Sequence, residues 1–215
     1  MLWAAVVRGE SMRDVLGSWE TSRVFWALLR SDDRTPIAIS FMLRISQSAV
    51  VKHLDKLRAV GLVRRGEKVG RYQRYEVDWG RACELLLREA PIFGPMLESG
   101  VFKGLADRLL SNEHFKKVVR GYFTALAKAI DEHGVLRAPP LPGPTIRDAI
   151  KGFEGWLNVY VPRLREDLEE PKLKDLVEAL KEWRSRLPKF VDFSELAMKE
   201  AFQRIGILKE ASEQG

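Results

Sequence analysis

The sequence predicts a mainly α-helical protein with one short β-hairpin, which follows three helices in the N-terminal third. Three observations support this prediction. Apolar residues recur at helical spacing along most of the 215 residues. An extended segment begins at Leu62-Val63, and apolar and polar residues alternate after residue 70, as is typical of a strand. Cap residues, prolines and glycines stand where these patterns begin and end.

The first three predicted helices lie close together in the sequence. An apolar helix runs over residues 22–30, and a short helix over 36–43 has Thr35 as its cap and Pro36 at its first position. Residues 46–60 form the third helix, with Ser46 as N-cap and Gly61 as the glycine that ends it. Val50, Leu54 and Leu57 give this helix one apolar stripe, so its other face is expected to point outward.

A two-stranded hairpin is predicted over residues 64–77. We expect Gly66–Gly70 to be its turn; the glycines there do not form a phosphate-binding loop. In the second strand Tyr75 is expected to face the core, with Tyr72 and Arg74 facing outward.

Positive charge is concentrated on this helix and hairpin. From Arg44 to Arg74 there are nine Lys and Arg against two acids, a net charge of +7, whereas the whole chain carries +6. Such a surface is typical of a protein that binds duplex DNA, because neutralised phosphates release condensed counterions.

Residues 12–80 resemble the winged helix-turn-helix of ArsR-like and MarR-like transcriptional regulators. The residues that carry the resemblance are Ser22-Arg-Val24, Ile45-Ser-Gln-Ser48, His53-Leu54, Leu57, Gly61-Leu-Val63, Gly70-Arg71 and Tyr75. The chain departs from the pattern at Ile39-Ser40-Phe41, where we expect a helix that buries more surface. It also has one cysteine, Cys83, where metal-sensing ArsR proteins use pairs; Cys83 is expected to be buried and inert.

The resemblance implies a DNA-binding transcriptional regulator. It would read duplex DNA with a recognition helix at 46–60 and a basic wing at 64–77. Residues expected in the major groove are Ser46, Gln47, Ser48, Val51 and Lys52, with Gln47 suited to adenine and Val51 to a thymine methyl group. Residues expected on phosphates are Arg44, Lys56, Arg65, Lys68, Arg71 and Arg74. Asp55, on the same helix face, is expected to pair with Lys52 or Arg58, or to accept from a cytosine.

The sequence divides into a winged-helix domain at 1–80 and an all-helical domain at 81–215 for oligomerisation or sensing. Helices are predicted over 81–90, 105–130 with a break near Asn112, 146–168, 173–187 and 193–208. A homodimer is expected, because two-fold operators take two recognition helices one duplex turn apart. Its interface is either the later helices, whose apolar stripes exceed one small core, or the segment 2–16. A small-molecule or protein effector is a further possible partner of this domain.

No enzyme, metal or cofactor signature is present. His53, His114 and His133 lack metal-ligand spacing, and the acidic residues 166–170 are expected to be a solvated helix end. There is no apolar run long enough for a membrane span and no signal-peptide pattern, so a cytoplasmic protein is expected. The alternative function is a winged-helix module that binds a protein of the transcription, replication or repair machinery.

Overall fold

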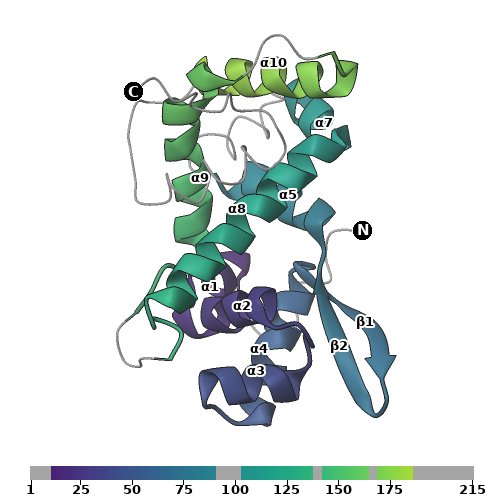
Figure 1. Cartoon of the computed structure of the whole chain (residues 1–215), viewed down its shortest axis with the longest axis vertical. Coiled ribbons are helices and arrows are strands. Elements are labelled where there is room, and N and C mark those ends of the chain that lie inside the picture. The colour runs from purple at the N-terminus through teal and green to yellow at the C-terminus, as the bar shows by residue number, and fades with distance from the viewer. Residues whose placement is uncertain (1–10, 91–102, 138–141, 165–168, 186–215) are drawn as a thin grey trace, which may run out of the picture. The chain divides into compact units, whose positions relative to one another are not determined.

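The computed structural model describes residues 11–90, 103–137, 142–164 and 169–185 (Figure 1). It confirms a mainly α-helical protein with one antiparallel hairpin. The chain forms two compact units: Met1–Arg81 with Leu126–Asp148, and Ala82–Ala125 with Ala149–Gly215. The first unit therefore ends near the predicted boundary at residue 80, but it also includes residues 126–148 from the C-terminal half, hereafter the 126–148 segment. The domain division at 80 itself stays a prediction.

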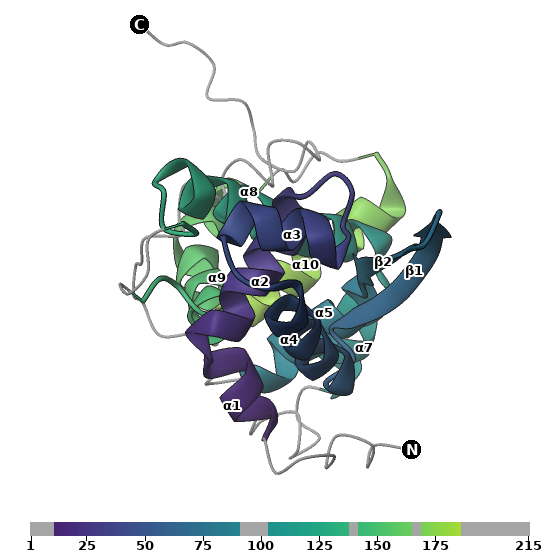
Figure 2. The same ribbon diagram turned by 90° about the horizontal axis from the view of Figure 1, so that it is seen from below.

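Four helices open the first unit: α1 (Met12–Gly17), α2 (Trp19–Arg30), α3 (Pro36–Leu43) and α4 (Gln47–Ala59). Their starts follow from side-chain caps. Thr35 accepts from the Ala38 amide at the start of α3, and Ser46 accepts from the Ala49 amide at the start of α4. In two perpendicular views α3 and α4 lie beside α2, and the hairpin extends from the same group (Figures 1 and 2).

Helix α4 ends just before Gly61, the glycine that the sequence predicted to end it. Gly61 has φ +79°, and its amide donates to the Arg58 carbonyl at 2.9 Å. The Leu62 amide reaches back to the Leu57 carbonyl at 3.0 Å. These two bonds form a Schellman motif, which satisfies carbonyls that would otherwise lack a donor and turns the chain into the hairpin.

The hairpin pairs β1 (Val63–Val69) with β2 (Tyr72–Val77). The predicted turn at Gly66–Gly70 is wrong. The strand pairing shifts between Arg65 and Lys68, so β1 contains a bulge and continues to Val69. Gly70, with φ +60°, and Arg71 then connect the two strands. A bulge lengthened the strand by one residue, which the simple alternation of side chains does not predict.

The core of the first unit joins the helices to the hairpin. Val50, Leu54 and Leu57, the predicted stripe of α4, are fully buried. Tyr75 is also buried, as predicted, and its amide donates to the Arg34 carbonyl in the loop between α2 and α3 at 2.9 Å. The hairpin is therefore fixed to the helices at its base by packing and by backbone bonding.

The second unit contains α5 (Trp79–Glu89), α7 (Lys103–Ser111), α8 (Glu113–Glu132), α9 (Ile146–Tyr160), a short 3-10 helix (Val161–Arg163) and α10 (Pro171–Ser185). The predicted break near Asn112 is confirmed, and the expected helix over 193–208 lies outside the described residues. Helices α5, α8 and α9 each continue across the division between the units.

Aromatic side chains fill the core of this second unit. Five of them make ring contacts at 5.6–6.3 Å between centroids: Phe115, Tyr122, Phe153, Trp156 and Trp183. All five are buried, and so is Cys83, as predicted. The large apolar residues on the stripes of α8, α9 and α10 are thus covered within a single chain, and the expected surplus for a dimer is not found among the described residues.

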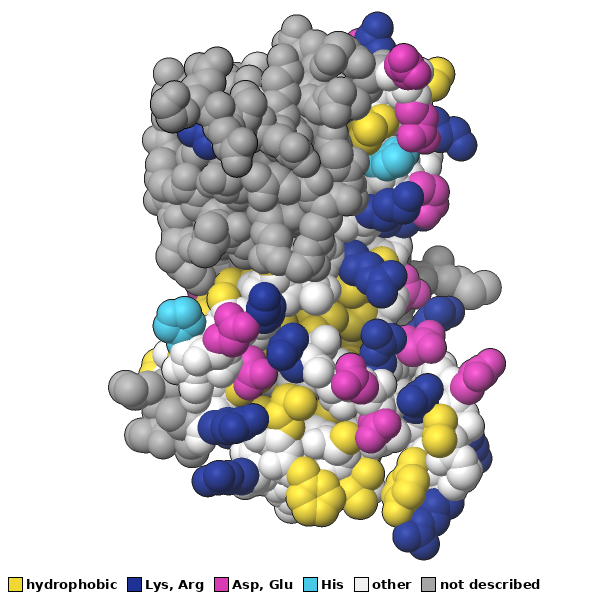
Figure 3. All heavy atoms as spheres, in the orientation of Figure 1, with side chains coloured by type: hydrophobic (Ala, Val, Ile, Leu, Met, Phe, Trp, Pro, Cys, Tyr) yellow, Lys and Arg dark blue, Asp and Glu magenta, His cyan; other side chains and the backbone are white. Residues whose placement is uncertain are grey.

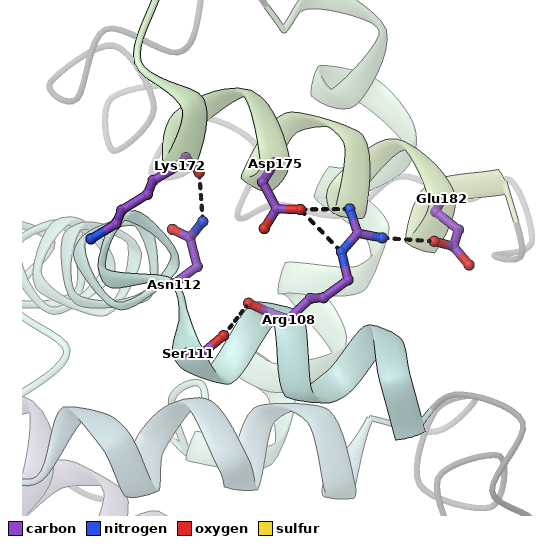
Figure 4. A network of polar contacts seen from close by, with 6 residues as sticks. All are labelled: Arg108, Ser111, Asn112, Lys172, Asp175 and Glu182. Carbon is purple, nitrogen blue, oxygen red and sulfur yellow. Dashed lines mark hydrogen bonds and ion pairs between the residues drawn. The ribbon is translucent and has the colours of Figure 1, made fainter.

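Charged side chains fasten α7 to α10 at the edge of the second unit (Figure 4). Arg108 donates to Asp175 at 2.7 Å and lies 3.5 Å from Glu182. The hydrogen bond to Asp175 raises the pKa of the Arg108 guanidinium. Asn112 caps α8 and donates through its amide to the Lys172 carbonyl at 2.6 Å. Among the described helices, none is long and apolar enough to cross a membrane.

Candidate nucleic-acid interface

The outer face of α4 carries the residues predicted for the major groove. Ser46, Gln47, Ser48 and Lys52 are exposed, and Val51 is half-buried. They point away from the core because Val50, Leu54 and Leu57 take the opposite face. The Ser46 hydroxyl already caps the helix and lies 3.1 Å from that of Ser48. Gln47 and Lys52 therefore retain the most capacity for an external partner.

Asp55, the acidic residue on this helix, pairs with a basic neighbour. Its carboxylate accepts from Arg58 at 2.7 Å, which agrees with one of the predicted pairings. The pair is a surface pair, so its contribution to stability is small. Lys56, on the same helix, is half-buried and also makes interactions within the protein.

Arg44 lies in the turn that joins α3 to α4. Its backbone is left-handed, with φ 54° and ψ 43°, a conformation that costs a non-glycine residue about 1–2 kcal/mol. The turn is closed by the Ile45 amide, which donates to the Ser40 carbonyl at 3.2 Å. The side chain of Arg44 is exposed, next to the first turn of α4. Glycine would be favoured here by backbone geometry alone.

The hairpin adds a second group of basic side chains. Arg65, Lys68 and Arg71 are exposed, and Figure 3 shows dark-blue side chains at the hairpin tip. The Arg71 guanidinium lies 5.1 Å from the centroid of the Tyr72 ring, a cation–π contact that orients it at the tip. Arg74 was expected to face outward, and its side chain also bonds within the protein. It is half-buried, and its Nε donates to the Asp33 carbonyl at 3.0 Å.

Helix α3 does not bury more surface at Ile39-Ser40-Phe41, contrary to our expectation. Ile39 is fully buried, but the Phe41 side chain is 77% exposed. Val69, at the hairpin tip, is the other large exposed hydrophobic residue of the described chain, at 49%. Figure 3 shows hydrophobic side chains over α3, at the same edge as the hairpin tip. Helix α3 therefore carries apolar side chains both on the face that packs on the core and on the face that points outward.

Arg34 is an additional basic residue that the sequence reading missed. It is exposed, with φ 52°, in the loop between α2 and α3, and its carbonyl holds β2. Its position beside the hairpin follows from a contact between residues 41 apart. The sequence signal was an arginine directly before the Thr35-Pro36 helix start, which alone indicates only a loop.

In a comparison with known protein families, residues 18–71 match the MarR family. The match spans α2, α3, α4 and most of the hairpin, the elements whose geometry is described above. Residues 18–71 are a MarR-family winged helix-turn-helix. This confirms the MarR-like resemblance, and the family is one of DNA-binding transcriptional regulators. The comparisons found no matching curated protein and no matching solved structure.

Across residues 11–90, 103–137, 142–164 and 169–185, no group of three or more His, Cys, Asp or Glu is placed to hold a metal ion. His53, at the edge of the α4 stripe, lies with its Nδ1 3.1 Å from the Thr21 hydroxyl of α2. That contact joins α4 to α2.

Proposed function

We propose that this protein is a transcriptional regulator that binds duplex DNA through the outer face of α4 and the basic hairpin. The MarR-family match supports DNA binding. The finer assignment is supported by the exposure of one set of side chains. On α4 these are Ser46, Gln47, Ser48, Lys52 and the half-buried Val51; around it they are Arg44, Arg65, Lys68 and Arg71.

The observation that carries the proposal is the division of α4 into two faces. One face is fully buried against the unit, and the other presents exposed polar side chains and a lysine. A helix of 13 residues with such a face fits the major groove, and amide, hydroxyl and methyl groups can read base edges there. The exposed arginines and lysines around it then contact phosphates.

We further propose that the protein binds as a homodimer. A two-fold dimer places two recognition helices about 34 Å apart, one duplex turn, and so reads a site long enough to be selective. The support is the symmetry of DNA operators, since the described C-terminal helices bury their apolar stripes within one chain. Oligomerisation or sensing by the second unit belongs to the same proposal.

Salt dependence of binding tests the interface. About six phosphate contacts give a slope near −5 in a plot of log binding constant against log salt concentration. K68A/R71A should make the slope shallower by roughly one unit per lost contact. The matched control is K151A/K174A, which removes the same charge from exposed positions of the second unit. Equal slopes for wild type and K68A/R71A would remove the hairpin from the interface.

A second candidate function is docking to another protein, and one observation favours it. Phe41 is 77% exposed on a helix without charged residues, whereas a DNA-contacting helix of a regulator has no need of an exposed phenyl ring. F41A separates the two functions. Unchanged DNA affinity with loss of a transcription-machinery partner supports docking, and loss of DNA affinity places Phe41 in the DNA interface.

A further inference from the structure

Helix α2 holds the 126–148 segment through a row of polar contacts on one face. The Ile146 amide donates to the buried hydroxyl of Ser22 at 2.9 Å, and the indole N–H of Trp26 donates to the Pro144 carbonyl at 2.8 Å. Arg30 pairs with Asp131 at 3.2 Å. These α2 residues are spaced by four, so they recur along one side of the helix.

Arg23, the residue after Ser22 on α2, bonds in two directions. Its Nε donates to the carbonyl of Leu136, in the 126–148 segment. Its Nη2 donates to the carbonyl of Leu43, the last residue of α3, at 2.9 Å. Burial lowers the pKa of this guanidinium, yet arginine stays charged at neutral pH. The Leu43 carbonyl is at the C-terminal end of α3, where carbonyls carry partial negative charge, so a cation there is favourable.

The position of the Leu43 carbonyl matters for α4. Only Arg44 and Ile45 separate Leu43 from Ser46, the cap of α4. A restraint on Leu43 therefore restrains the turn that sets where the recognition helix begins.

We infer that Arg23 is a positioning residue through which the 126–148 segment controls the geometry of the helix-turn-helix. The inference rests on the proposed DNA-binding function. The segment begins with the last part of α8 and ends with the first turn of α9, and both helices continue into the second unit. A ligand or partner that shifts α8 or α9 thus acts on the Leu136 carbonyl, and Arg23 transmits the shift to the turn before α4.

The test compares R23A and R23K with R30A in the full-length protein. Arg30 is the matched control, because it lies on the same helix and its ion pair goes to the same segment, at Asp131. Hydrogen exchange should become faster in R23A both at residues 43–48 and at 134–137. R30A should affect only the neighbourhood of Asp131. R23K keeps the positive charge but cannot donate to both carbonyls as the guanidinium does. Its exchange rates should therefore lie between those of wild type and R23A.

Binding to the best duplex from a random-library selection provides the second readout. R23A should weaken it about fivefold, with the salt slope unchanged because Arg23 makes no phosphate contact. R30A should bind like wild type. An unchanged hydrogen-exchange rate at residues 43–48 in R23A overturns the inference. If R23A does not fold, the same result in R23K does so. A variant that exchanges faster there but binds DNA with wild-type affinity also overturns it. If the wild-type protein binds no DNA, the proposed function fails while the exchange experiment still decides the role of Arg23.

Discussion

At the scale of single residues, backbone geometry and charge make opposite demands at Arg44. Its left-handed conformation favours glycine, while its exposed position beside α4 suits a phosphate contact. Gln47, on the next helix, has no such conflict. It is exposed, lies in the first turn of α4, and carries both a donor and an acceptor.

Substituting Arg44 by glycine separates stability from binding. R44G should keep or raise the free energy of unfolding, by up to about 1 kcal/mol, because glycine relieves the left-handed strain. It should at the same time weaken DNA binding and reduce the salt slope by about one unit. R34G is the control for the unfolding free energy alone, since Arg34 also has a left-handed backbone but precedes α3. Chemical denaturation and anisotropy titrations measure the two effects, and unchanged DNA binding in R44G would exclude Arg44 from the interface.

Gln47 is predicted to specify a base. Q47A should cost about 1–3 kcal/mol on the best site and less on sites changed at one base pair, since only the paired amide discriminates that base. Competition titrations with single-position variants of the site measure this. A uniform loss on every sequence would mean that Gln47 only positions the helix.

At the scale of elements, caps and end motifs determine where the helices begin and end. Gly61 shows this most clearly, because its φ of +79° closes the Schellman motif after α4 and starts β1. We expect G61A to lower the free energy of unfolding by about 1–2 kcal/mol. G104A, in helix α7 without a neighbour within 4 Å, should cause no loss. Equal stabilities of G61A and wild type in urea denaturation would contradict the role of this glycine.

A contact between α8 and the start of α10 makes stability depend on pH. Glu170 accepts from His114 at 2.9 Å if the histidine Nε2 is protonated, and this bond lowers the pKa of Glu170 below its usual 4.5. A depressed carboxyl pKa stabilises the folded state above pH 4.5, and that stability is lost as pH falls through the folded-state pKa. When the pH is lowered below 4.5, the melting temperature Tm of E170Q should therefore fall less than that of wild type. E169Q, the neighbouring exposed glutamate, should behave like wild type in the same melting series; a wild-type profile in E170Q would contradict the prediction.

Local signals in the sequence were enough to predict α3, α4 and the glycine stop. Thr35, Pro36, Ser46 and Gly61 act on residues within a few positions, so their effects can be read from the chain itself. The exposed side of α4 followed from its apolar stripe in the same way.

Other features depend on contacts between distant residues and were not predictable. The bulge in β1 depends on strand pairing, and the side-chain bond of Arg74 depends on the loop at Asp33. The packing of the 126–148 segment on α2 joins residues more than 100 positions apart. Periodicity identifies which face of a helix will be buried, but not which other element will cover that face.

At the scale of the whole molecule, the first unit combines the N-terminal 81 residues with the internal 126–148 segment. A fragment ending at Gly80 would lack the 126–148 segment and leave the bonded face of α2 uncovered. Oligomeric state is therefore best measured on the full chain. Light scattering at micromolar concentration should give a mass near twice 24.6 kDa. A mass near 24.6 kDa would contradict the homodimer and favour the docking function.

Selection from a random DNA library with the purified full-length protein tests the central claim most directly. The account predicts enrichment of a two-fold symmetric site whose half-sites lie about 10 base pairs apart, bound with a salt slope near −5. It also predicts that K52A, which removes a charge from the exposed face of α4, weakens binding to that site, whereas K151A does not. Enrichment of no sequence, together with binding that does not weaken as salt rises, would contradict the account.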